Sequence, residues 1–298
     1  MQVKKVTLIP FVAGTLVLLH TILLNAVTPP ADLANGVRYS FYWVLVVVSS
    51  LGTNLLALYL GYCAQSLQQP WRHLSKLWFY FIVVGLLSVI WGSWFFKAFA
   101  AQDLWLLLFP ISSHLFPFAA SVLVWYLLGP FLVRYLAQWS KQSRRALIFL
   151  LLIAVFGLPA IFAKPLWGIT TASNVVWVGT LFVLGNLLAQ GELKWLLKIR
   201  YNLVLVLAGL VLIVSSVRLT PLAQSAAELN GRIYTSHGIV GGLLSLTLFG
   251  LLVKFSSAHW PTLQQPSWPN WYAFGAYLLS GLPIISYHLK NELQLMLR

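Results

Sequence analysis

Long uninterrupted apolar runs constrain the fold of this chain more than any other feature. Each run approaches the roughly 20 residues that an α-helix needs to cross a bilayer. Hydrophobic residues make up 60% of the chain and charged residues only 8%, against roughly 25% charged in soluble domains, so a soluble globular domain is excluded. The runs cover residues 6–27, 41–64, 77–97, 114–134, 146–163, 171–190, 200–217, 236–256 and 270–288.

We therefore expect an all-α fold, a polytopic transmembrane bundle of about nine to ten helices. The stretch 98–113 is the doubtful one, because its apolar core is too short to span and is more typical of a re-entrant or interfacial segment. No period of 20 to 50 residues repeats along the chain, so repeat-built transporter folds gain no support. The economical interpretation is a single domain over residues 1–298.

The distribution of basic residues predicts the orientation of this bundle. The chain has 19 Lys and Arg residues against five Asp and Glu residues, a formal net charge of +14. With the N-terminus in the cytoplasm, 12 basic residues fall on the inner side and 7 on the outer side, as the positive-inside rule requires. Basic residues scattered over loops suit anionic lipid headgroups better than a nucleic acid. A multi-pass protein of the plasma membrane is the expected result.

Several classes of chemistry find no support in the sequence. The single cysteine, Cys63, excludes an intramolecular disulfide, and no Cys/His spacing suggests a metal site. All five acidic residues lie outside the expected helix cores, whereas ion-coupled carriers place carboxylates within the membrane. Walker, GxSxG and HExxH motifs are absent from the sequence. Histidine, arginine and hydroxyl chemistry remain.

His20 is the leading candidate for a functional residue. It lies in the apolar sequence LVLLHTILLN, where an imidazole needs a polar partner or a water-filled cavity. Intramembrane ionisable residues are commonly functional. The structural alternative is that His20 only bonds the backbone or a hydroxyl group of a neighbouring helix.

Two further groups of polar residues could bind ligands. His114 follows Ser113 and begins a helix on the expected outer side, although histidines at helix starts are more often interfacial. Arg72 and Lys76 follow the second apolar run on the inner side, and their four-residue gap places them on one face of a helix. That pair could bind a phosphate group, and the alternative is a loop that binds lipid headgroups.

Laid end to end, these segments resemble the acyltransferase type 3 family of integral-membrane O-acyltransferases, in its shorter Gram-positive form. The segment VAGTLVLLHTILLN resembles the first helix of that family, which ends its apolar run in a His-Thr pair. WRHLSKLWFYF resembles the basic cytoplasmic loop of the family. The stretch LFPISSHLFPFAASVLVWYLLGPFLVRYLAQWSKQ resembles a helix that ends in a Leu-Ser-Pro-Phe-like turn, here residues 128–131.

The resemblance implies transfer of an acetyl or other acyl group from cytoplasmic acyl-CoA to a hydroxyl of a cell-surface or lipid-linked glycan. In that reaction His20 would be the catalytic residue, as general base or transient acyl carrier. Arg72 and Lys76 would hold the phosphates of acetyl-CoA, while Ser113, His114 and Arg38 would receive the sugar. Cell-envelope biosynthesis proteins would be partners, and the bacterial cell membrane the location.

Two positions depart from the pattern of the family. Ile9 stands where the family carries an arginine, and Ser280 stands where it carries a late histidine. A catalytically silent membrane subunit of a surface-polysaccharide system is therefore one alternative. A facilitative small-molecule transporter is the other, because the lack of intramembrane carboxylates counts against coupled transport but not against facilitation.

Overall fold

A computed structural model of the chain describes residues 8–25, 36–64, 75–76, 78–80, 82–87, 90, 117–162, 167, 169, 171–219, 237–259 and 275–278. Within these ranges the fold is all-helical and contains no strand. The helices are α1 (Leu8–Asn25), α2 (Gly36–Cys63), α5 (Pro117–Gln138), α6 (Lys141–Leu151), α7 (Leu158–Phe162), α8 (Val175–Ala189), α9 (Ile199–Leu219) and α11 (Ile239–His259), with a π-helix, η3 (Leu152–Gly157), and a 3₁₀ turn, η5 (Lys194–Leu197).

Three of these helices are long and apolar enough to cross a membrane. They are α2 over Val37–Cys63, α5 over Pro117–Gln138 and α11 over Ile239–Ser256. The other described helices coincide with apolar runs of the sequence, while the segments expected at 98–113 and over most of 270–288 lie outside the described residues.

Helix α5 corrects one expectation from the sequence. Residues 128–131 do not end the helix, because α5 continues through Pro130 to Gln138. Proline lacks an N–H group, so the carbonyl of Tyr126 receives no intrahelical bond from this position. Packing compensates for that loss, since the helix buries Val133 and Leu136 beyond the proline. The ring of Phe182 lies against Gly129 just before it.

Helix α8 forms the centre of the bundle. All its residues except the first two are buried, as expected for a helix that is apolar on every side. A Cβ atom on Gly61 of α2 would overlap the carbonyl oxygen of Phe182, and one on Gly185 would overlap the carbonyl of Leu58. The backbones of α2 and α8 therefore touch, in the close packing that small residues permit within membranes.

Side-chain contacts define the relative directions of the helices. Near the start of α8 the indole of Trp177 bonds Asn54 of α2, and further along both helices Asn186 donates to the carbonyl of Gly61. These helices therefore run parallel. Contacts of the same kind show that α5 and α11 run in the same direction as α2 and α8. They include the bond of Trp125 in α5 to Val175 in α8 and the bond of Asn54 in α2 to Ser245 in α11.

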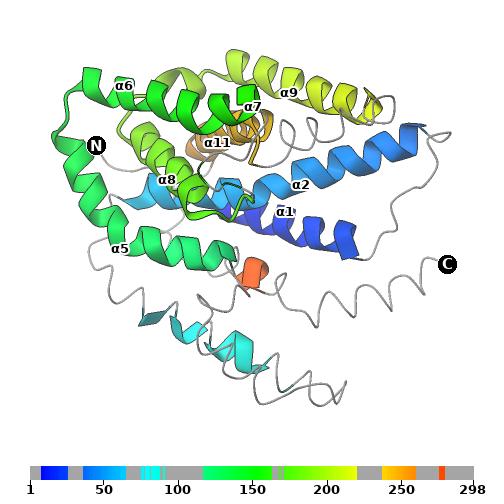
Figure 1. Cartoon of the computed structure of the whole chain (residues 1–298), viewed down its shortest axis with the longest axis horizontal. Coiled ribbons are helices and arrows are strands. Elements are labelled where there is room, and N and C mark those ends of the chain that lie inside the picture. The colour runs from blue at the N-terminus through cyan, green and yellow to red at the C-terminus, as the bar shows by residue number, and fades with distance from the viewer. Residues whose placement is uncertain are drawn as a thin grey trace.

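The remaining helices run the opposite way. Tyr42, near the start of α2, donates to the carbonyl of Leu23 near the end of α1, so α1 and α2 are antiparallel (Figure 1). The start of α6 meets the end of α8 through Arg144 and Gln190. Asn202 and Gly209 of α9 meet Gly250 and Leu244 of α11 in reverse order. In the described part of the chain, the helix directions therefore agree with a chain that crosses a membrane once with each successive apolar run of the sequence.

Candidate functional site

His20 lies between α1 and α2, where its imidazole meets the second helix. Its Nδ1 atom is 3.2 Å from the carbonyl oxygen of Val46 and 3.2 Å from the hydroxyl oxygen of Ser49. The Ser49 hydroxyl donates to the same carbonyl at 2.9 Å. These are the backbone and hydroxyl bonds of the structural alternative, so His20 helps to join the two helices.

The same bonds favour one position for the hydrogen of the ring. A carbonyl oxygen can only accept, and the hydroxyl of Ser49 has already donated its hydrogen to Val46. The hydrogen of a neutral imidazole therefore belongs on Nδ1, which leaves the lone pair on Nε2. No hydrogen bond joins Nε2 to another described residue. The ring is thus held so that Nε2 is its accepting atom.

A small apolar and aromatic cluster joins the same two helices. Tyr42 is buried and its ring meets that of Trp43 edge-on, with centroids 5.4 Å apart. Leu19 and Leu23 of α1 pack beside them. The same cluster includes Val46, whose carbonyl oxygen contacts His20.

The other predicted site residues are distributed as follows. Arg38 is exposed in the first turn of α2, about 12 Å along the helix axis from Val46 at 1.5 Å per residue. Lys76 is exposed, and within the described part of the chain it forms no hydrogen bond with His20 or Arg38. The remaining three, Arg72, Ser113 and His114, lie outside the described residues, as does Ser280.

A buried polar network joins three helices at the centre of the bundle. The indole Nε1 of Trp177 donates to Oδ1 of Asn54 at 2.9 Å, and Nδ2 of Asn54 donates to the hydroxyl of Ser245 at 3.0 Å. Ser245 in turn donates to the carbonyl of Gly241. All three side chains are fully buried. Hydrogen bonds between polar side chains hold membrane helices together in a defined arrangement. We therefore assign this network a structural role.

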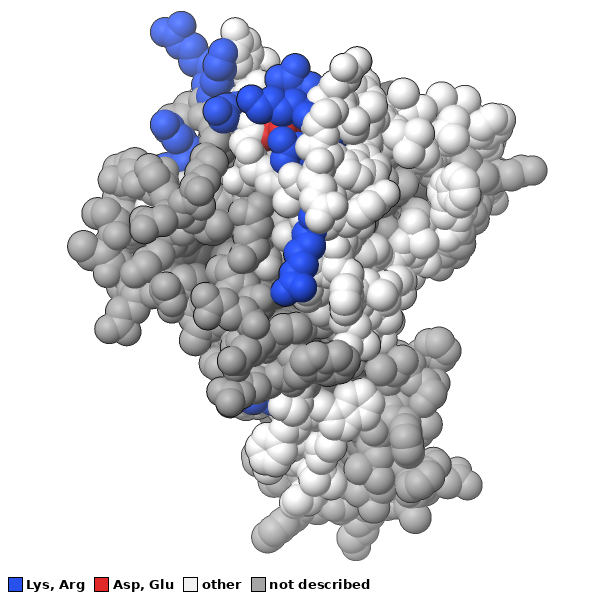
Figure 2. All heavy atoms as spheres, turned by 90° about the vertical axis from the view of Figure 1, so that its left-hand side faces the viewer, with Lys and Arg blue, Asp and Glu red and all other residues white. Residues whose placement is uncertain are grey.

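A charged cluster gathers at one end of the bundle (Figure 2). Arg144 forms an ion pair with Glu192 at 3.0 Å and donates to Gln190 at 2.6 Å. Arg145 lies 3.7 Å from the same carboxylate, which is 5% exposed. Glu192 is the one acidic residue within the described ranges. Four further basic residues lie at the start of α6 and in the segment that leads from α8 into α9: Lys141, Lys194, Lys198 and Arg200.

Reasoning from the sequence missed the partners in these clusters. Ser49 was detectable as one of two adjacent serines in the apolar run VLVVVSSLG, because hydroxyl groups inside membranes commonly face another polar group. The pairing of Glu192 with Arg144 had no comparable signal, since the two residues are 48 positions apart. Asn174, a polar residue in an apolar context, caps α8 by accepting from the backbone of Val176.

Comparison with known proteins adds no relative to these observations. No protein-family model matches the chain, no curated protein matches it, and no solved structure matches it. The proposals that follow rest on the residues, on their geometry and on the resemblance described for the sequence.

Proposed function

We propose that the chain is a multi-pass protein of the bacterial cell membrane, with about nine to ten transmembrane helices and a cytoplasmic N-terminus. The support is the alternation of helix directions. The three helices that are long and apolar enough to cross a membrane, α2, α5 and α11, run parallel, so the chain must return across the same thickness between them. The continuous helical stretch 141–162 and α9 run in the returning direction. Their basic ends gather together, as the positive-inside rule requires of a cytoplasmic face.

Within this membrane protein we propose acyl transfer, with His20 as the catalytic base. The observation that carries the proposal is the bond from Nδ1 to Val46 and Ser49, which orients Nε2 as a proton acceptor. Nε2 removes the proton of an acceptor hydroxyl as its oxygen bonds to the thioester carbonyl carbon. The carbon–sulfur bond then breaks, and the proton passes from Nε2 to the leaving thiolate of CoA.

The proposed substrates follow the resemblance stated for the sequence. Acetyl-CoA is the donor, with its phosphates on Arg72 and Lys76 at the inner face. A glycan hydroxyl is the acceptor, received by Ser113, His114 and Arg38. Arg38 lies in the first turn of α2, at the end of the bundle where α1 finishes after His20. This is the end that we assign to the outer side, which supports an approach of the sugar from there.

Label transfer tests this proposal. Membranes that contain the wild-type chain, His20→Ala or no added protein receive radiolabelled acetyl-CoA, and label is counted in extractable glycan. Because general base catalysis contributes about 10²–10⁴-fold, we expect His20→Ala to lose at least 100-fold of the activity. His237→Ala is the matched control, since His237 is another partly buried histidine that has no part in the proposed chemistry. Equal transfer by wild type and His20→Ala would exclude the catalytic role.

A catalytically silent subunit is the second candidate, and one observation favours it. Ile9, at the position where the resemblance predicts an arginine, is 0% exposed and belongs to the apolar core. No cation can therefore act from that position on α1. Folded wild-type protein that transfers no label above empty membranes, with glycan acceptor present, would favour this second function.

A further inference from the structure

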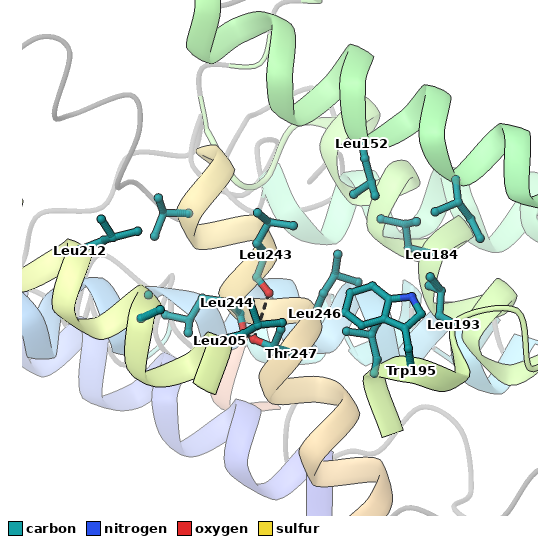
Figure 3. Close-up of a pocket in the computed structure, with 15 residues that line it drawn as sticks. Leu152, Leu184, Leu193, Trp195, Leu205, Leu212, Leu243, Leu244, Leu246 and Thr247 are labelled. Atoms are coloured by element: carbon teal, nitrogen blue, oxygen red, sulfur yellow. Dashed lines mark hydrogen bonds between the residues drawn. The ribbon is translucent and has the colours of Figure 1, made fainter. Parts of the chain in front are cut away.

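A narrow apolar groove opens between α6, α8, η5, α9 and α11 (Figure 3). Its volume is about 240 Å³, below the roughly 300–1,000 Å³ of pockets for drug-sized ligands. The floor is formed by buried residues such as Leu184 and Leu196, while Leu205, Leu212 and Leu243 form an exposed rim. The groove residues Leu205 and Leu212 are about 10 Å apart along the axis of α9. A long, thin ligand fits this shape.

The lining of the groove selects hydrocarbon. Among the described residues that line it, Thr247 carries the only polar side chain apart from the indole of Trp195. The hydroxyl of Thr247 donates back to its own helix, to the carbonyls of Leu243 and Leu244. No described side chain therefore offers a free hydroxyl, amide or charge along the length of the groove. An acyl chain needs none of these groups, whereas a sugar or nucleotide does.

One end of the groove lies next to the charged cluster around Glu192, which we call the basic cluster because of its excess of cations. The lining residue Ile148 follows Arg144 by four positions on α6, so both lie on one face of that helix. On the opposite wall, the lining residues Trp195 and Leu196 lie between Lys194 and Lys198. The ion pair of Arg144 with Glu192 joins the two walls. The described segments 141–151 and 192–200 carry six cations, Lys141, Arg144, Arg145, Lys194, Lys198 and Arg200, against the one carboxylate of Glu192, and the ion pairs of Arg144 and Arg145 with Glu192 link the two segments.

We propose that this groove binds one anionic phospholipid, with an acyl chain along α9 and α11 and the phosphate headgroup on the basic cluster. Charge complementarity selects the headgroup, because Lys194, Lys198 and Arg200 are all exposed and the cluster carries a large excess of positive charge. The apolar lining selects the chain. A zwitterionic lipid gains the same chain contacts but less from the cations. The inference goes beyond acyl transfer and rests only on the proposed embedding in a membrane.

Photo-crosslinking in nanodiscs tests the groove. The full chain is reconstituted with phosphatidylglycerol or phosphatidylcholine, each carrying a diazirine in the same acyl chain, and labelled peptides are mapped by mass spectrometry. We expect phosphatidylglycerol to label α9, α11 and η5 at least tenfold more than phosphatidylcholine. Ala208→Trp places an indole in the groove and should remove this labelling, whereas Leu207→Trp should not, because Leu207 is exposed on α9 outside the lining. Equal labelling by both lipids would show a general lipid contact and would overturn the proposal.

Neutralising the cluster provides a second test that does not depend on the bulky variant. Each cation near a membrane surface contributes about a fivefold preference for anionic lipid at low salt. Lys194→Gln, Lys198→Gln and Arg200→Gln combined should therefore reduce the preference for phosphatidylglycerol over phosphatidylcholine at least fivefold, with Lys141, Arg144 and Arg145 still in place. Arg38→Gln, at the start of α2, should leave the preference unchanged. An undiminished preference in the triple variant would contradict the inference. Recovery of the chain in carbonate-washed membranes separately checks the embedding itself.

Discussion

Replacing Asn54 by leucine perturbs the centre of the bundle in a way whose cost can be worked out. Asn54 is fully buried and accepts the indole hydrogen of Trp177 at 2.9 Å. Leucine has a similar size but no acceptor, so the Nε1–H group of Trp177 loses its partner among buried side chains. The hydroxyl of Ser245 keeps its bond to Gly241. The variant thus leaves the indole donor of Trp177 without this acceptor while it keeps the branched shape of the side chain.

The expected cost lies between two reference values. A buried donor without a partner costs about 1–3 kcal/mol, whereas bonds between membrane helices average about 0.6 kcal/mol and reach about 1.7. Because Trp177 is 0% exposed, we expect Asn54→Leu to lower the free energy of unfolding by about 1–2 kcal/mol. That loss is a factor of about 5–30 in the ratio of folded to unfolded protein.

A double-mutant cycle separates this bond from general packing. The free energy of unfolding is measured in mixed micelles by far-ultraviolet circular dichroism for Asn54→Leu, Trp177→Phe and the pair. Phenylalanine removes the indole donor, so Asn54→Leu should cost about 1 kcal/mol less in that background. Thr180→Ala serves as the control partner, because the hydroxyl of Thr180 bonds its own helix at Val176. That pair should add within about 0.5 kcal/mol. Full additivity of Asn54→Leu and Trp177→Phe would refute the reasoning.

Three other substitutions probe different parts of the fold. Gly61→Ala should destabilise the protein by about 1–3 kcal/mol, because the new Cβ meets the Phe182 backbone, as a micelle unfolding titration would show. Arg144→Met should cost up to about 3 kcal/mol in the same assay, because Glu192 is 5% exposed and loses its nearest partner. Burial lowers the pKa of His237 below 6.5, so the unfolded chain takes up its proton first. The free energy of unfolding should therefore fall as the pH drops below 6.5, and His237→Gln should flatten that fall.

Each of these predictions has a control. Gly157→Ala should be tolerated at its site, since its Cβ would lie 3.6 Å from the nearest atom. Arg145→Gln should cost less than about 1 kcal/mol, because that side chain is 68% exposed. Equal effects of Gly61→Ala and Gly157→Ala, or of Arg144→Met and Arg145→Gln, would contradict the packing and the ion pair described above. A pH slope that survives in His237→Gln would assign the titration to another group.

Hydropathy predicted the helical segments well and their ends less well. The run expected at 200–217 becomes α9 at Ile199–Leu219, because an apolar run of bilayer length has few alternatives to a helix. The run expected at 146–163 begins earlier, at Lys141, because Ser140 caps the helix by accepting from the backbone of Ser143. The first turns of α6 are polar and helical at once. Hydropathy marks the residues suited to lipid, not the hydrogen bonds that end a helix.

The candidate site was predictable only in part. An imidazole is easily recognised inside an apolar run, so His20 could be selected from the sequence alone. Its partner Ser49 lies 29 residues away, and the pairing depends on how α1 and α2 rotate about their axes. The groove is harder still, because it is formed by segments between Ile148 and Thr247 whose apolar residues look alike in the sequence.

The proposed chemistry depends most directly on which ring nitrogen of His20 carries the hydrogen. Nitrogen-15 NMR of histidine-labelled protein without a polyhistidine tag measures this tautomer, and the signal lost in His20→Gln assigns the residue. The bonds from Nδ1 to Val46 and Ser49 predict a neutral ring with the hydrogen on Nδ1 and a lone pair on Nε2. A neutral ring that carries its hydrogen on Nε2 would contradict the role of His20 as a base at that atom.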